Sequence, residues 1–239
     1  MNIIKKLLGL QNYKPLNLIE ISRANLLHNY KILSSVNKKV EIAPVLKSNA
    51  YGHGLTLVAR VLDSIASLQN DKIPFFCVDS IYEAYELLKA KIKTPILIMG
   101  YIDPENLKVK RLPFSYAVWN LELARAINKY QSHSGVHLFV DSGMGREGVG
   151  VDELPRFLEQ FKNIPNLKVE GLMSHLASGE LPGDPLTKLQ IKNFQKAQDI
   201  VKKFGIIPKW IHLSNSGGVF NNLNPGCNMT RVGLALYGI

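Results

Sequence analysis

The chain has 239 residues, of which 46% are hydrophobic and 20% are charged, and this composition excludes an intrinsically disordered protein. The formal net charge of +10 favours anionic partners, but the basic residues are scattered without a nucleic-acid-binding motif, so we expect a small anionic ligand and no nucleic acid. The apolar runs are too short to cross a bilayer, so we expect no membrane span.

Residues 1–15 are expected to be an N-terminal extension. Met1–Leu10 combines two lysines with several apolar residues, but its apolar stretch is too short for a signal peptide and no small-residue cleavage site follows. We therefore expect a short amphipathic helix and a cytoplasmic protein. Cys77 and Cys227 form neither a disulfide framework nor a metal-binding spacing, so both thiols are expected to be reduced and no metal site is expected.

From residue 16 onward, short apolar runs alternate with longer amphipathic segments. The eight runs expected to be strands are Ile42–Leu46, Phe75–Val78, Pro95–Met99, Tyr116–Val118, Val136–Val140, Val169–Met173, Trp210–Leu213 and Val232–Leu236. The segments with helical periodicity are Ala24–Ser34, Leu55–Ala66, Ile81–Ala90, Leu121–Tyr130, Asp152–Phe161 and Pro185–Phe204. This alternation indicates βα units and a parallel sheet.

Eight strands over this length predict an α/β fold of the (β/α)₈ TIM-barrel type, occupying residues 16–239. A doubly wound sheet is the alternative. A ninth run, Leu16–Ile21, alternates like an exposed or edge strand. The eighth strand ends almost at Ile239, so we expect no second domain in this sequence.

Lys47 is the first candidate for chemistry, because it follows an apolar strand and precedes the segment Ser48–Gly54. The carboxyl ends of barrel strands form the active face. A partly desolvated lysine there is nucleophilic enough to form a Schiff base with an aldehyde. A salt-bridged lysine at a sheet edge is the alternative.

The segment Asp141–Gly148 contains the pattern G-x-G-x-x-G after a strand. A dinucleotide-binding loop is one interpretation, but that fingerprint normally opens the first βα unit of a sheet, and four strands precede this one. We favour a glycine-rich loop that brings Arg146 close to a ligand.

Several polar residues lie within or beside the last three predicted strands. His175 ends the sixth run, where a structural histidine is the usual case and a ring stacked on a ligand is the alternative. His212 lies within the seventh run and is expected to be buried. Ser214–Gly218 offers small side chains and backbone amides, as a phosphate site requires, although an ordinary polar turn would look the same. Arg231 opens the eighth run and needs an acceptor.

Together, these features indicate a ligand with an aldehyde, a phosphate and a hydrogen-bond acceptor. Pyridoxal 5'-phosphate (PLP) has all three. Arginine does not readily give up its proton, so pairing Arg231 with the pyridine nitrogen would leave that nitrogen largely unprotonated. Such a ring withdraws electrons moderately, which suits proton exchange better than transamination.

The chain resembles the alanine racemase family in its N-terminal PLP-binding barrel, of fold type III, from about Leu16 to Ile239. The resemblance rests on the segment VLKSNAYGHG at 45–54, on Asp141–Arg146, Ser174–His175 and His212–Ser216, and on RVGLALYG at 231–238. It implies a PLP-dependent racemase that interconverts L- and D-alanine for peptidoglycan synthesis, with serine or lysine racemases as relatives. A homodimer is expected for full-length members of the family.

The resemblance also implies residue roles. Lys47 would carry the Schiff base and act as the base on one face of the substrate α-carbon. The other cofactor-binding residues would be Tyr51, Ser216 and the amides of Gly233 and Leu234 at the phosphate, with Asn215 nearby, Arg146 near the phenolic oxygen, His175 against the ring, and Arg231 at the ring nitrogen. His212 would orient Arg231 from behind.

Two features depart from the family pattern. Many members carry a carbamylated lysine where this chain has Phe139, so Arg146 must be positioned otherwise. The sequence also stops before the C-terminal β-domain, whose tyrosine supplies the opposite-face base, so the chain by itself is expected to racemise alanine poorly. A non-catalytic, single-domain PLP carrier is one alternative, and a dinucleotide-dependent oxidoreductase is another.

Overall fold

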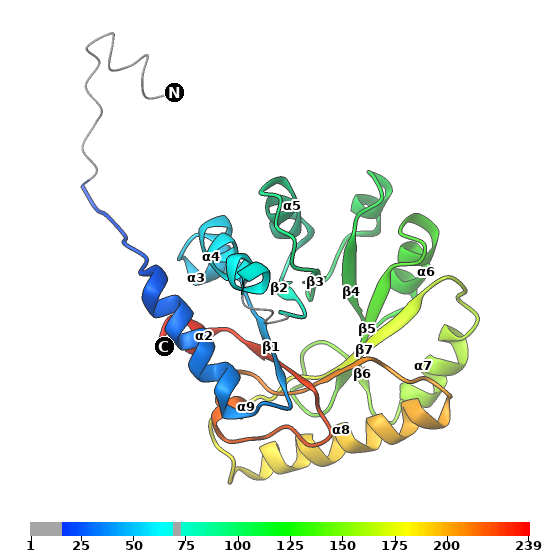
Figure 1. Ribbon diagram of the computed structural model, residues 1–239. Coiled ribbons are helices and arrows are strands. Elements are labelled where there is room, and N and C mark those ends of the chain that lie inside the picture. Colours follow the sequence, from blue (N-terminus) through cyan, green and yellow to red (C-terminus); the bar gives the residue numbers. More distant parts are fainter. Residues whose placement is uncertain (1–15, 69–72) are drawn as a thin grey trace.

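The computed structural model describes residues 16–68 and 73–239 and contains a curled, all-parallel sheet surrounded by helices (Figure 1). The predicted helix at Met1–Leu10 lies outside the described residues. The strands of the barrel are β1 (Glu41–Pro44), β2 (Phe76–Val78), β3 (Ile96–Ile98), β4 (Phe114–Val118), β5 (Gly135–Asp141), β7 (Lys168–Met173), β8 (Trp210–His212) and β9 (Met229–Val232). Each lies within or beside a predicted apolar run.

Strand pairing follows the barrel order. Neighbouring strands pair in parallel from β2 through β3, β4, β5 and β7 to β8, and β1 pairs in parallel with β9. An isolated bridge between Val45 and Cys77 joins the β1 segment to β2. The other seam is linked by the Arg231 amide, which donates to the Ser214 carbonyl at 3.1 Å. The predicted (β/α)₈ barrel is therefore confirmed, with a short additional strand, β6 (Val149–Gly150), paired to β5.

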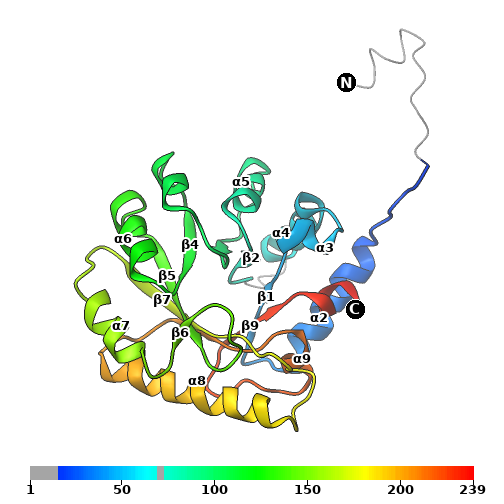
Figure 2. The same ribbon diagram turned by 180° about the vertical axis from the view of Figure 1, so that it is seen from behind.

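Helices cover the outside of the strands in both ribbon views (Figures 1 and 2). They are α2 (Arg23–Val36), α4 (Leu55–Leu68), α5 (Ile81–Lys89), the 3₁₀ turn η1 (Pro104–Lys108), α6 (Leu121–Tyr130), α7 (Leu154–Phe161) and α8 (Pro185–Lys203). Three short elements lie on loops: α3 (Lys47–Tyr51), α9 (Ser216–Phe220) and the 3₁₀ turn η2 (Leu234–Tyr237). Within the described ranges, no helix is long and apolar enough to cross a membrane.

Alternation along each strand separates two apolar layers. In β2, Phe76 and Val78 belong to the large core beneath the helices, whereas Cys77 belongs to a smaller cluster inside the barrel. This is the two-residue period expected of a strand that is buried on both faces.

Capping residues fix the starts of the helices. On α5, the Ser80 hydroxyl and the Glu83 carboxylate complete a capping box.

Two predicted strands need correction. Leu16–Ile21 contains no strand: no described strand pairs with it, and the Leu16, Leu18 and Ile19 side chains are exposed. The predicted strand Val232–Leu236 is displaced, because the last strand runs from Met229 to Val232 in register with Glu41–Pro44. Leucine and alanine residues after Gly233 instead form the 3₁₀ turn η2, which packs beside α2. Arg231 therefore lies inside the strand and not at its start.

Candidate active site

A cavity of about 430 Å³ opens at the carboxyl ends of the strands. All nine residues predicted to bind a cofactor line it: Lys47, Tyr51, Arg146, His175, Asn215, Ser216, Arg231, Gly233 and Leu234. His212 does not line the cavity, and it lies behind Arg231 with its side chain fully buried. The barrel thus brings together residues that are separated by almost the whole chain.

Lys47 begins a segment with an unusual backbone. Ser48–Tyr51 all have φ between +53° and +55°, in the left-handed region, which costs roughly 1–2 kcal/mol for each residue other than glycine. One local and one tertiary hydrogen bond hold this turn. The Asn49 side chain accepts from the Leu55 amide at 2.8 Å, at the first residue of α4, and the Asn49 amide donates to the Glu83 carboxylate at 3.3 Å. The turn places both Lys47 and Tyr51 on the cavity wall.

A group of backbone amides faces the Ser216 hydroxyl. The amides of Gly233 and Ala235 each donate to Ser216 Oγ at 3.2 Å. A Cβ at position 233 would lie 2.3 Å from the Tyr51 hydroxyl, so only glycine lets Tyr51 approach this closely. Amides that converge beside two hydroxyls form the kind of pocket that binds a phosphate. The residues present therefore fit the phosphate of PLP.

Arg231 is 3% exposed and has acceptors on several sides. Its guanidinium donates to the carbonyls of Ser174, His212 (3.2 Å) and Leu213 (3.3 Å), and it contacts Nδ1 of both His175 (3.2 Å) and His212. Burial lowers its pKa to about 10, so the group remains charged at neutral pH. The contacts fix the side chain while it still lines the cavity.

The histidines that touch Arg231 are neutral. Burial, and then the charge of Arg231, lower the pKa of His175 to about 3. The same two causes hold the pKa of His212 well below its usual value. A neutral imidazole has one nitrogen that accepts a hydrogen bond. Both rings can therefore accept from Arg231 at their Nδ1 atoms.

Arg146 is held differently, in the glycine-rich loop after β5. The Asp141 carboxylate closes this loop by accepting from the amides of Gly143, Met144 and Gly145 at 2.8–2.9 Å. These amides thus face a carboxylate of their own loop, whose negative charge would repel a pyrophosphate, and this argues against a dinucleotide site. Arg146 is half exposed and pairs with the neighbouring Glu147.

Phe139, which stands in place of the modified lysine that the resemblance led us to expect, packs against Trp119. The rings meet edge to face with their centroids 5.8 Å apart, and Phe139 is buried. Phe139 has no polar group to offer Arg146, and the described partner of Arg146 is Glu147. Sequence reasoning did not identify Glu147, Asp79 or Glu180, which also line the cavity; Asp79 could have been found as the first polar residue after β2.

Comparisons with known proteins agree with this geometry. Residues 21–239 match the family model "Alanine racemase, N-terminal domain". The chain is 34% identical over 231 residues to an alanine racemase from Citrifermentans bemidjiense, and the match covers 92% of this chain but 59% of that protein. The chain thus spans about three-fifths of the length of that relative.

Solved structures give the same result. The alanine racemase from Bacillus anthracis with bound L-Ala-P superposes with a TM-score of 0.83 at 27% identity, and the match covers 96% of this chain and 59% of that one. The Clostridium difficile 630 alanine racemase in complex with cycloserine superposes with a TM-score of 0.79 at 28% identity, over 90% of this chain and 58% of that one.

Proposed function

The chain belongs to the alanine racemase family through its N-terminal domain, and from that premise we propose that it binds PLP at Lys47 and exchanges the α-proton of alanine. The observation that carries the proposal is the convergence of Lys47, the Ser216–Gly233 phosphate pocket and Arg231 on one cavity. When bound through a lysine, PLP acts as an electron sink that acidifies the α-proton of an amino acid.

We assign the residues the roles that the family resemblance implies, and their positions around the cavity are compatible with these roles. The hydroxyls of Tyr51 and Ser216 and the amide of Gly233 would hold the phosphate, with the amide of Leu234 and the side chain of Asn215 nearby. Arg231 would donate to the ring nitrogen through Nε, for which the described residues supply no acceptor, while the contacts of Nη1 and Nη2 fix the guanidinium. A permanently charged donor leaves an acceptor nitrogen unprotonated. This arrangement limits electron withdrawal and supports proton exchange over transamination.

The remaining residues act around the ring. His175 would pack against it while its Nδ1 contacts Arg231, and His212 would hold Arg231 from behind. Arg146 would reach the phenolic oxygen from the β5 loop. Lys47 would move the α-proton of the amino acid on the face that it occupies.

Borohydride reduction tests the cofactor site directly. The purified chain would be incubated with PLP, reduced, digested and analysed by mass spectrometry. We expect the pyridoxyl group on Lys47, and its loss in Lys47→Ala, whereas Lys209→Ala serves as a control at the opposite end of the barrel. A pyridoxyl group on another lysine in the wild-type chain would overturn the assignment of Lys47.

Proton exchange separates a catalyst from a PLP carrier. Racemisation needs acid–base groups on both faces of the α-carbon, and one positioned group is typically worth about 10²–10⁴-fold in rate. Lys47 serves one face, while the described contacts of Tyr51 and His175 tie both to the cofactor site. We expect slow exchange of the α-proton in D₂O with mostly retained configuration. No exchange with bound PLP would favour the carrier, and rapid racemisation would reveal a second base within the sequence given.

A further inference from the structure

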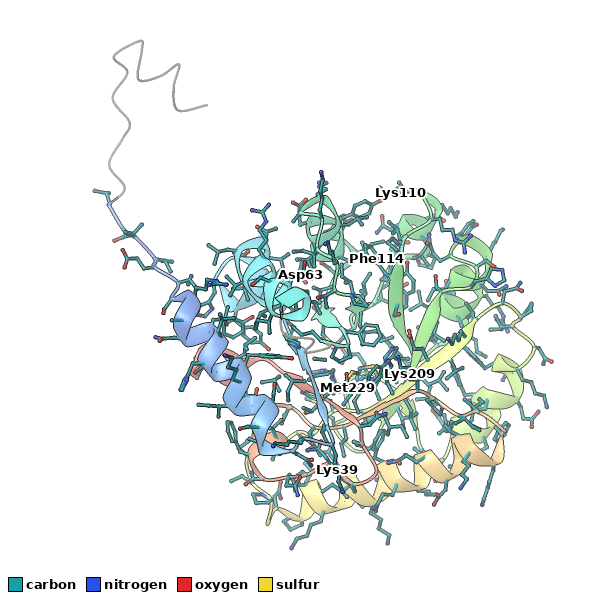
Figure 3. All side chains as sticks on the ribbon, in the orientation of Figure 1. Lys39, Asp63, Lys110, Phe114, Lys209 and Met229 are labelled. Carbon is teal, nitrogen blue, oxygen red and sulfur yellow. The ribbon has the colours of Figure 1, made fainter. Side chains whose placement is uncertain are left out.

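A line of buried polar groups continues from Arg231 through the inside of the barrel. Arg231 contacts His212 Nδ1, and His212 Nε2 lies 2.8 Å from His137 Nδ1. His137 Nε2 in turn lies 3.9 Å from a carboxylate oxygen of Glu170. Both histidine side chains are 0% exposed. The line thus runs from the proposed cofactor site toward the amino end of the barrel, where Glu170 lines a second cavity with residues such as Trp210 and Lys209; Lys209 is labelled in Figure 3.

Hydrogen-bond chemistry fixes the proton positions along this line. Arginine can only donate, so His212 Nδ1 must accept and His212 must carry its proton on Nε2. That proton is then donated to His137 Nδ1, so His137 must carry its own proton on Nε2. The described residues contain no hydrogen-bond partner for this Nε2. Glu170 is the acceptor that a small shift would bring within bonding distance.

The backbone is shaped to admit both ends of the line. Between β5 and β7 the register shifts, so that Val136 faces Val169 and His137 faces Gly171, leaving Glu170 as an extra residue. A β-bulge of this kind re-aims a side chain, and Glu170 accepts from the Ser115 hydroxyl at 2.8 Å.

Two glycines make the space. A Cβ at Gly171 would lie 2.1 Å from His137 Nδ1, and a Cβ at Gly135 would lie 2.1 Å from Glu170 Oε2. Side chains at either position would displace the ring or the carboxylate. Packing alone does not explain why a histidine occupies position 137. Its buried Nε2 has no hydrogen-bond partner among the described residues, and such a nitrogen lowers folding stability by about 1–3 kcal/mol.

The charges of Arg231 and Glu170 at the two ends of the line favour the same direction of hydrogen bonding. Within residues 16–68 and 73–239, Arg231 forms no ion pair with a carboxylate. Burial, and then the charge of Arg231, lower the pKa of His137 to about 3, so the ring is neutral. It can therefore accept a hydrogen bond at Nδ1 and donate one from Nε2. A carboxylate at the far end polarises each bond toward itself. That polarisation makes His212 Nδ1 a stronger acceptor for Arg231.

We propose that His137 and Glu170 are positioning residues for Arg231, which hold one tautomer of His212 from the amino end of the barrel. The proposal deepens the proposed function and rests on it for its consequence, since Arg231 is the group that would face the cofactor ring. The line itself exists without cofactor and can be measured in the chain alone.

Nuclear magnetic resonance of the ¹⁵N-histidine-labelled chain without PLP is the first test. We expect both His137 and His212 to be neutral with the proton on Nε2, and a scalar coupling across the bond from His212 Nε2 to His137 Nδ1. A proton on Nδ1 of either ring, or the absence of that coupling, would overturn the proposal. Neither outcome depends on PLP, so failure of the line and failure of the cofactor assignment are distinguishable.

Variants give the second test. His137→Leu should shift the His212 ring resonances and weaken PLP binding about tenfold, as the loss of one hydrogen bond of the line would. His137→Gln, whose amide can both accept and donate, should largely restore both. Gln131→Leu removes another buried polar side chain, one that bonds the segment Leu107–Leu112 away from the site; it should lower stability while leaving the His212 resonances and PLP binding unchanged. A His137→Leu chain that behaves like Gln131→Leu would assign His137 a structural role only.

Discussion

Two arginines line the same cavity and are held in opposite ways. Arg231 is buried in the last strand with acceptors on several sides, whereas Arg146 lies on a loop with its side chain 49% exposed and one charged neighbour, Glu147. The first side chain has its position fixed before any ligand arrives. The second can adjust its position when a ligand binds.

This difference separates two tasks within the site. A group that sets the electronic state of a cofactor must stay in place through every step, and preorganised groups do this without a reorganisation cost. A group on an exposed loop at the edge of the site, such as Arg146, can adjust its position as a ligand enters or leaves. We therefore expect damage around Arg231 to affect folding and cofactor chemistry together, and damage around Arg146 to leave folding stability almost unchanged.

The largest effect is expected from Arg231→Met. Removing the guanidinium leaves buried carbonyls and imidazole nitrogens without a donor, so the free energy of unfolding should fall by about 3–5 kcal/mol. Arg146→Met is the matched control and should change it by less than about 0.5 kcal/mol. Urea denaturation of both variants measures the contrast. Equal losses in the two variants would remove the distinction between the arginines.

The next largest effect is expected from acid, which should lower folding stability through the buried histidines around Arg231. His137 and His175 have folded-state pKa values of about 3, below the unfolded value near 6.5. Between those values the unfolded chain binds more protons, so stability falls as pH falls, by about 1.4 kcal/mol per pH unit for each histidine. Urea midpoints measured from pH 7 to pH 5 should show this slope, and His137→Gln should reduce it. An unchanged slope in that variant would mean that His137 is not neutral in the folded chain.

Gly233→Ala tests the proposed phosphate pocket without changing a charged residue. The new Cβ would lie 2.3 Å from the Tyr51 hydroxyl, so Tyr51 must move and the phosphate pocket loses a hydroxyl. We expect PLP binding to weaken at least about tenfold, or 1.4 kcal/mol. Gly183→Ala, where a Cβ meets no atom within 4 Å, is the control. Fluorescence titration with PLP would contradict the pocket assignment if both variants bind equally.

The smallest effect is expected from Glu147→Gln. Exposed ion pairs contribute roughly 0–1 kcal/mol and weaken in salt. The variant should therefore unfold within about 0.5 kcal/mol of the parent chain. Denaturation at low and high salt measures this, and a loss above 2 kcal/mol would show that Arg146 is as firmly held as Arg231.

Sequence reasoning predicted the barrel from local patterns, whereas the resemblance to the family supplied Tyr51, Gly233 and Leu234 of the candidate site. Apolar runs of strand length revealed the strands, and polar residues after those runs marked the active face. The left-handed turn at Ser48–Tyr51 had no such signal, because its backbone is imposed by tertiary bonds such as that between the Asn49 amide and Glu83.

Features that depend on strand register also escaped prediction. The last strand begins at Met229 because it pairs with Glu41, a choice that apolar content alone does not reveal. Glu170 reads in the sequence as one more residue of the sixth run, and only the register shift against β5 turns it toward His137. Leu16–Ile21 alternates like a strand, but a strand also needs a partner.

The protonation state of the ring nitrogen tests the central claim, that a fixed Arg231 faces the cofactor. PLP labelled with ¹⁵N in the ring would be bound to the chain at neutral pH and observed by nuclear magnetic resonance. We predict an unprotonated nitrogen in the wild-type chain and a shift toward the protonated form in Arg231→Glu, whose carboxylate can accept that proton. A protonated nitrogen in the wild-type chain, or an identical resonance in the two proteins, would contradict the account.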